Sequence, residues 1–107
     1  MKLWLDDRRE APAGWVWAKT AAEAIALIDA GTFDEVSLDH DLGDSAHEPE
    51  WTGYTVLCHI ESKVVWDADY VAPKIYTHSD NAPGIRKMRL GIESITRYMR
   101  AKLGNET

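Results

Sequence analysis

Apolar and polar positions along the chain form blocks that predict four short strands. Each block is a run of a few apolar residues bounded by polar or turn-forming residues, which is typical of strands. Acidic, imidazole or hydroxyl side chains stand at the ends of the first, third and fourth runs. We predict strands at residues 3–5, 15–17, 36–38 and 74–79.

Three further segments carry apolar residues at helical spacing. Residues 20–31 begin with a Thr/Glu capping box and end at a glycine, and a second helical pattern begins at Thr52. In residues 85–99, apolar side chains recur at alternating steps of three and four, which predicts a long amphipathic helix. The resulting order of elements predicts an α/β fold with a mainly parallel sheet and helices on both faces.

Composition narrows the class of protein. A chain of 107 residues with 45% hydrophobic and 28% charged residues suits one compact domain, residues 1–107. The start MKLWLDD reaches acids too soon for a signal peptide, and no long uncharged apolar run follows, so we expect a cytoplasmic protein that does not enter a membrane. The single cysteine, Cys58, lies in an apolar pattern and is expected to be a small buried thiol.

Polar side chains follow three of the predicted strands at the point where each strand ends. Because parallel strands place their carboxyl ends along one edge, where ligands bind, these side chains are expected to converge. The alternative is that they solvate loops or cap the helices that follow. The converging residues would be Asp6 and Asp7, then Asp39 and Asp41, and finally His78 and Ser79.

Four aspartates at one edge would repel one another unless a cation neutralised them. Oxygen ligands without cysteine favour Mg²⁺, Mn²⁺ or Ca²⁺ over Zn²⁺, and the chain lacks the DxDxDG loop of an EF-hand. We predict Mg²⁺, or else Mn²⁺, held among Asp6, Asp7, Asp39 and Asp41. Such a cation keeps open positions for phosphate oxygens, so the predicted substrate is a phosphate.

A helix start near the same edge would favour an anion. Ser79, Asp80 and Asn81 stand just before Pro83, a residue favoured at the first position of a helix. The unpaired amides at that helix end could bind phosphate, with Ser79 and Asn81 as substrate-binding residues, although ordinary capping explains them equally well. Arg8 and Arg9, which follow the acidic pair, could bind the phosphate too, or pair loosely with nearby acids.

The motifs at these positions resemble a divergent group of response-regulator receiver domains, the cyclic-phosphate-processing receiver family. The segments that carry the resemblance are LDDRR, SLDHDLG, TGY and HSDNAPG. The resemblance implies a flavodoxin-like sheet and a metal bound by Asp6 or Asp7 with Asp39. It also implies His40 and His78 as catalytic groups, and as substrate either a cyclic nucleotide or an RNA end that carries a cyclic phosphate.

A metal-dependent phosphoesterase is the function that these residues favour, with Asp39, His40 and His78 as its catalytic residues. An imidazole can take and give a proton near neutral pH, so the two histidines could activate water and protonate the leaving oxygen. His47 and His59 are expected to be surface or packing residues.

Two other functions stay open. One is a signalling receiver with Asp39 as phosphoacceptor, although no fifth strand ends in the lysine that such domains use. The other is a nucleotide-binding module without catalysis. The net charge of -6 argues against extensive binding of duplexes, but an RNA end needs only a small positive patch. The sequence leaves the oligomeric state open.

Overall fold

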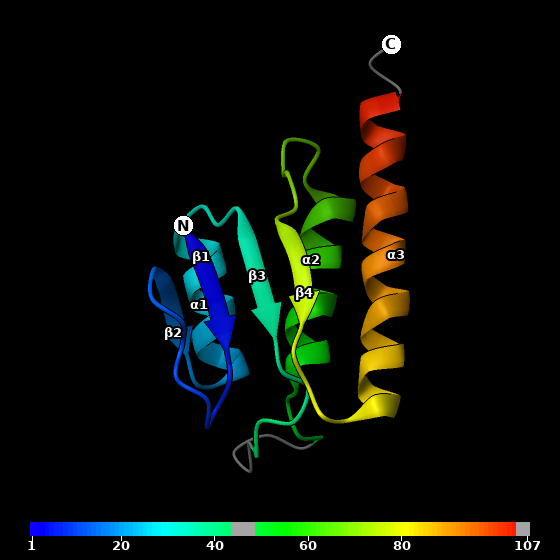
Figure 1. The fold of residues 1–107 in the computed structure, drawn as a ribbon. Helices are drawn as coiled ribbons and strands as arrows, with labels where there is room; N and C mark the ends of the chain where they lie inside the picture. The colour runs from blue at the N-terminus through cyan, green and yellow to red at the C-terminus, as the bar shows by residue number, and fades with distance from the viewer. Residues whose placement is uncertain (44–48, 105–107) are drawn as a thin grey trace.

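The structure, a computed structural model, describes residues 1–43 and 49–104, so that His47 lies outside the described residues. Four strands form one parallel sheet in the order β2-β1-β3-β4 (Figure 1). The strands are β1 (Lys2–Leu5), β2 (Trp15–Ala18), β3 (Glu35–Leu38) and β4 (Lys74–Thr77). The helices are α1 (Ala21–Ala30), α2 (Gly53–Trp66) and α3 (Ala82–Gly104). The predicted receiver-like parallel sheet is confirmed.

The helices begin where the capping residues of the sequence predict. Thr20 precedes α1, and its side-chain oxygen accepts a hydrogen bond from the amide of Glu23 at 3.1 Å. Thr52 precedes α2 and forms a capping box with Thr55. These bonds satisfy amide groups that the first helical turn leaves without partners.

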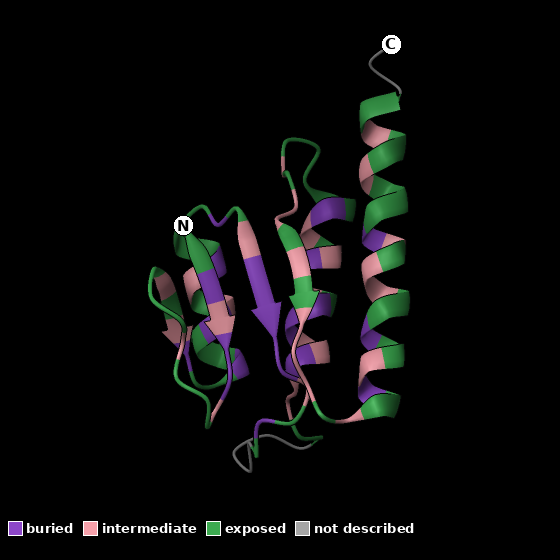
Figure 2. Cartoon of the chain, viewed as in Figure 1, coloured by how far each residue is buried: buried purple, intermediate pink, exposed green. Residues whose placement is uncertain are grey.

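The hydrophobic core lies between one face of the sheet and the helices (Figure 2). Alternate residues of β1 and β3 point toward the helices, which gives these two central strands fully buried apolar side chains. Strand β4 forms an edge of the sheet, so Ile75 is only partly buried, although its position predicts complete burial. The buried strand residues at the centre are Leu3, Leu5, Val36 and Leu38.

Helices α1 and α2 lie on the same face of the sheet, and α3 packs against α2 beside strand β4 (Figure 1). Helix α2 packs against both α1 and α3. The crossovers from β2 to β3 and from β3 to β4 run in the same direction, so right-handed connections place α1 and α2 on one face. The connection from β1 to β2 runs in the opposite direction, but residues 6–14 form a loop without a helix.

Cys58 corrects another expectation, because the thiol is exposed. The buried positions of α2 include Val56, Leu57, Ile60 and Val64, and Cys58 lies outside that stripe. Because Val56, Leu57 and Ile60 lie close to Cys58 in the sequence, the apolar pattern does not show that Cys58 faces away from the core. No helix among the described residues is long and apolar enough to cross a membrane.

Candidate functional site

The backbone ladder of the sheet continues for one residue past the strands and brings the candidate site residues into register. The amide of Asp39 donates to the Leu5 carbonyl at 3.0 Å, and the amide of His78 donates to the Leu38 carbonyl at 3.1 Å. Strand β1 lies between β2 and β3, so the chain passes from β1 to β2 on one side and then crosses over to β3 on the other side. Ligands of open parallel sheets bind at such a switch point.

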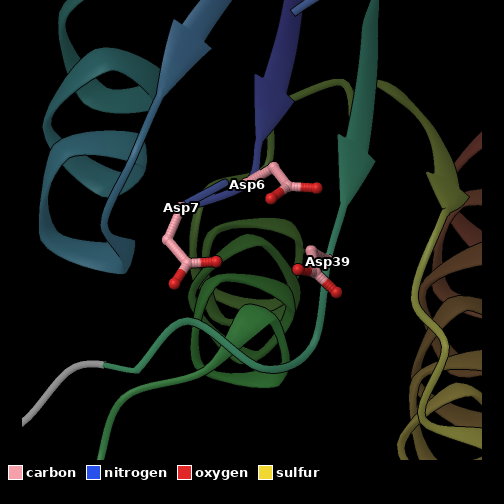
Figure 3. A group of neighbouring side chains, drawn as sticks. All are labelled: Asp6, Asp7 and Asp39. Carbon is pink, nitrogen blue, oxygen red and sulfur yellow. The ribbon is translucent and has the colours of Figure 1, made fainter. Parts of the chain in front are cut away.

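Three carboxylates gather at this point (Figure 3). Asp6 and Asp7 follow β1, Asp39 follows β3, and one ligand oxygen from each lies within 4.8 Å of the others. The three side chains line a cleft of about 450 Å³ that also includes Asp41, Arg8 and Ser79. All four aspartates therefore converge on the cleft, as the parallel sheet predicts, and three of them form the carboxylate group.

Asp6 is fixed as a carboxylate. It is 1% exposed, and its Oδ1 accepts hydrogen bonds from the backbone amides of Arg8 at 2.8 Å and Arg9 at 2.9 Å. Burial alone would raise the pKa of Asp6, but these two bonds and the nearby His78 and Arg9 outweigh it and hold the pKa below its ordinary value. Asp6 thus contributes a permanent negative charge at neutral pH.

The pKa of Asp39 is shifted in the opposite direction to that of Asp6. Burial and the neighbouring negative charge of Asp6 raise its pKa, and hydrogen bonding from Ser79 offsets them only in part. A divalent cation between the carboxylates would remove this repulsion. The gathered donors are all carboxylate oxygens, the hard ligands that Mg²⁺ and Mn²⁺ accept. The three residues therefore fit a cation of this class.

A glycine allows α2 to begin directly against the site. The amide of Gly53 donates to the His40 carbonyl at 3.0 Å. A Cβ at this position would lie 1.9 Å from the Asp39 carbonyl oxygen, so no larger residue fits without a backbone shift. The TGY motif therefore serves as a cap, through Thr52, and as the close contact that fixes the backbone of Asp39.

His78 joins the carboxylate group from β4. Its Nε2 lies 3.2 Å from Asp6 Oδ2, its Nδ1 lies 2.7 Å from the Ser37 hydroxyl, and its ring stacks on Trp4 at 3.7 Å between centroids. Burial lowers the pKa of His78, and the negative charges of Asp6 and Asp39 oppose that effect. Both ring nitrogens are thus within hydrogen-bonding distance of a partner.

His40, Asp41 and Asn81 form an adjoining network. His40 Nδ1 lies 2.7 Å from Asp41 Oδ1, and the Asn81 side chain donates to both Asp41 oxygens at 3.1 and 3.2 Å. Asn81 in turn accepts the amide of Gly84 at 3.0 Å, which is the capping role that the sequence allows. Asp41 lines the cleft but does not belong to the group of three, so its predicted role as a metal ligand gains no support.

Arg9 takes the second role that the sequence allows, because it pairs with the nearby acids Asp6 and Asp80. Its guanidinium donates to the His78 carbonyl at 2.9 Å and to the Asp80 carboxylate at 2.6 Å, which ties the β1 loop to the end of β4. Arg8, the predicted phosphate ligand, is exposed and lines the cleft. Two adjacent arginines after an acidic pair suggest one phosphate ligand and one partner for acids, but the sequence does not show which arginine has which role.

Ser37 is a site residue that the sequence pattern did not predict. It is a buried hydroxyl in the middle of β3, and it holds the ring of His78. Its signal in the sequence is slight, a single polar residue between Val36 and Leu38. His59 lies away from the site and pairs with Asp29 at 2.8 Å, as expected of a surface histidine.

The parallel sheet with carboxylates after its first and third strands defines a receiver-like domain. A family model described as the cyclic-phosphate processing receiver domain matches residues 1–94. The chain therefore belongs to this family. Searches of curated proteins and of solved structures gave no match.

Proposed function

We propose that this receiver domain is a phosphoesterase that uses a divalent cation to open a cyclic phosphodiester. The observation that carries the proposal is the group formed by Asp6, Asp7 and Asp39, whose ligand oxygens lie within 4.8 Å of one another. These residues would hold Mg²⁺ or Mn²⁺. When bound, such a cation neutralises charge on phosphate oxygens and lowers the pKa of coordinated water. The description of the family supports a cyclic phosphate as substrate.

Hydrolysis adds the oxygen of one water molecule to phosphorus and breaks one bond between phosphorus and a ribose oxygen. One proton must leave the water, and one must reach the departing oxygen, so two proton carriers suffice. His40 is suited to this work because the contact between its Nδ1 and Asp41 Oδ1, at 2.7 Å, orients the ring. His78 lies against Asp6 and would supply the second carrier. Arg8 and Ser79 line the cleft where the phosphate would bind.

The test is a panel of 2′,3′-cyclic and 3′,5′-cyclic nucleotides and an RNA end with a 2′,3′-cyclic phosphate, each with Mg²⁺, Mn²⁺ or EDTA. Turnover is expected only with metal. His40→Gln and His78→Gln should each reduce kcat by roughly 10² to 10⁴. Asp69→Asn, an exposed acid at the other end of the sheet, is the matched control. Metal-independent turnover, or wild-type rates in both histidine variants, would exclude the mechanism.

A phosphoacceptor role for Asp39 is the second candidate, favoured by its place at the end of β3 in a receiver domain. Strand β4 forms the edge of the sheet, and within residues 1–43 and 49–104 no further strand supplies a lysine beside the acid. Acetyl phosphate followed by mass spectrometry separates the two candidates, because a phosphoacceptor gains one phosphoryl group on Asp39 and a hydrolase does not. Tight nucleotide binding without turnover would instead indicate a binding module.

A further inference from the structure

The sheet has a second face that no described helix covers. Strand residues alternate, so the neighbours of the buried leucines point away from the helices. In the view of Figure 1, α1 and α2 lie behind the sheet. The aromatic residues on the open face, called the aromatic face below, are Trp4, Trp15, Trp17 and Tyr76.

The aromatic face combines rings with positive charge. Trp4 and Trp15 meet edge to face at 6.1 Å between centroids. Lys2 Nζ lies 5.6 Å from the centre of the Trp15 ring, and Lys19 Nζ lies 4.6 Å from that of Trp17. Strand β2 forms an edge of the sheet, and both of its tryptophans are partly exposed. Rings with adjacent cations are the elements that bind single-stranded nucleic acid, because bases stack on the rings and phosphates pair with the cations.

The aromatic face is continuous with the carboxylate site. Trp17 Nε1 donates to the carbonyl of Asp6 at 2.7 Å, and Trp4 stacks on His78 with an interplanar angle of 6°. Trp15 lies two residues before Trp17, so Trp15 is about 7 Å further from the site along the strand. A ligand that extends from the cleft along β2 would therefore meet Trp17 first and Trp15 next.

We propose that the aromatic face binds bases of a single-stranded RNA whose terminal cyclic phosphate occupies the carboxylate cleft. This inference rests on the proposed function and selects an RNA end over a cyclic mononucleotide as its substrate. A mononucleotide has one base and could use only the ring nearest the cleft. Lys19, beside Trp17, matches the negative charge of an RNA backbone, and Lys2 adds to it although its Nζ also pairs with Glu35 at 3.3 Å. This charge favours RNA over a second copy of this acidic chain.

Trp15 provides the test, because it contacts Trp4 and Lys2 but none of the carboxylates. A fluorescein-labelled pentauridylate with a 2′,3′-cyclic phosphate end is titrated in Mg²⁺ with protein that carries His40→Gln, which slows turnover and leaves the carboxylates in place, and anisotropy gives the Kd. Trp15→Ala and Trp15→Leu should each raise the Kd by about 5- to 150-fold, the range measured for loss of one stacked base. Trp15→Phe, which keeps a ring, should retain most of the affinity. Trp66→Ala, at a tryptophan that is 84% exposed on α2, should bind as the wild type does.

Three outcomes would overturn the inference. The first is that Trp15→Ala binds the pentamer with an unchanged Kd while it still melts as a folded protein. The second is that uridine 2′,3′-cyclic phosphate binds as tightly as the pentamer does. The third is dimerisation through this face, seen as a doubled mass in sedimentation that Trp15→Ala returns to the monomer. Hydrolysis of the cyclic mononucleotide is measured in parallel. If the Kd depends on the ring of Trp15 but no hydrolysis occurs, only the proposed function is refuted. If hydrolysis occurs but the Kd does not depend on that ring, only this inference is refuted.

Discussion

Replacing Asp39 by asparagine should stabilise the metal-free protein, although the residue is almost fully buried. Its carboxylate and that of Asp6 have ligand oxygens within 4.8 Å of each other. At that separation two unit charges repel by roughly 3 kcal/mol with an effective dielectric constant of about 20. Asp6 accepts two backbone amides that reduce its effective charge, so we expect a gain of about 1–2 kcal/mol, or roughly 5–10 °C in Tm.

The gain should depend on pH in a direction that the raised pKa of Asp39 fixes. The folded state binds a proton at Asp39 more tightly than the unfolded state does. The stability that this proton contributes is therefore complete below the unfolded pKa and is lost as the pH rises through the folded pKa. The advantage of Asp39→Asn should be complete at pH 7 and fade as the pH falls into the range where Asp39 is protonated. Urea unfolding in EDTA between pH 4 and pH 7 measures this.

The same substitution should remove the response to metal. For the wild-type protein, Mg²⁺ at 100 times its Kd should add about 2.7 kcal/mol to the free energy of unfolding. Asp39→Asn should lose most of that increment, while Asp69→Asn keeps it. A variant that is less stable than the wild type in EDTA and equally stabilised by Mg²⁺ would refute both the charge repulsion and the metal site.

Two other substitutions separate the site from the rest of the fold. Gly53→Ala should destabilise by about 1–3 kcal/mol and weaken the Mg²⁺ response, because the new Cβ would lie 1.9 Å from the Asp39 carbonyl. Its control is Gly104→Ala, where a Cβ meets nothing within 4 Å, and equal urea midpoints for the two variants would contradict the close contact. Thr20→Ala removes the cap of α1 and should cost about 1 kcal/mol in urea unfolding without changing the Mg²⁺ response. A changed response would mean that α1 is coupled to the site.

Local patterns were enough to predict the elements and part of the site. Capping threonines and the spacing of apolar residues placed the helices, and short apolar runs placed the strands. The positions of Asp6 and Asp39 followed from parallel pairing, because every such strand delivers its last residue to the same edge. Cys58 was mispredicted because it directly follows Val56 and Leu57, and adjacent apolar residues do not reveal which side of a helix faces the core.

The contacts between site residues depend on long-range packing that no local pattern encodes. The bonds of Arg9 to the end of β4 and of Ser37 to His78 join residues far apart in the chain. Asp7 belongs to the carboxylate group and Asp41 does not, although Asp7 stands one residue after Asp6 and Asp41 only two residues after Asp39. That difference arises because His40 and Asn81 hold the Asp41 carboxylate.

The sequence by itself determined the order of the elements, the parallel sheet and the edge where acids converge, because these follow from side-chain periodicity and connection length. Only the tertiary structure decided which face the helices cover. The direction of each crossover fixes that face, and the loop of residues 6–14 leaves the opposite face open. The tryptophans of β1 and β2 thus lie beside the carboxylate cleft with one side toward solvent, an arrangement that depends on how the chain winds and not on the residues alone.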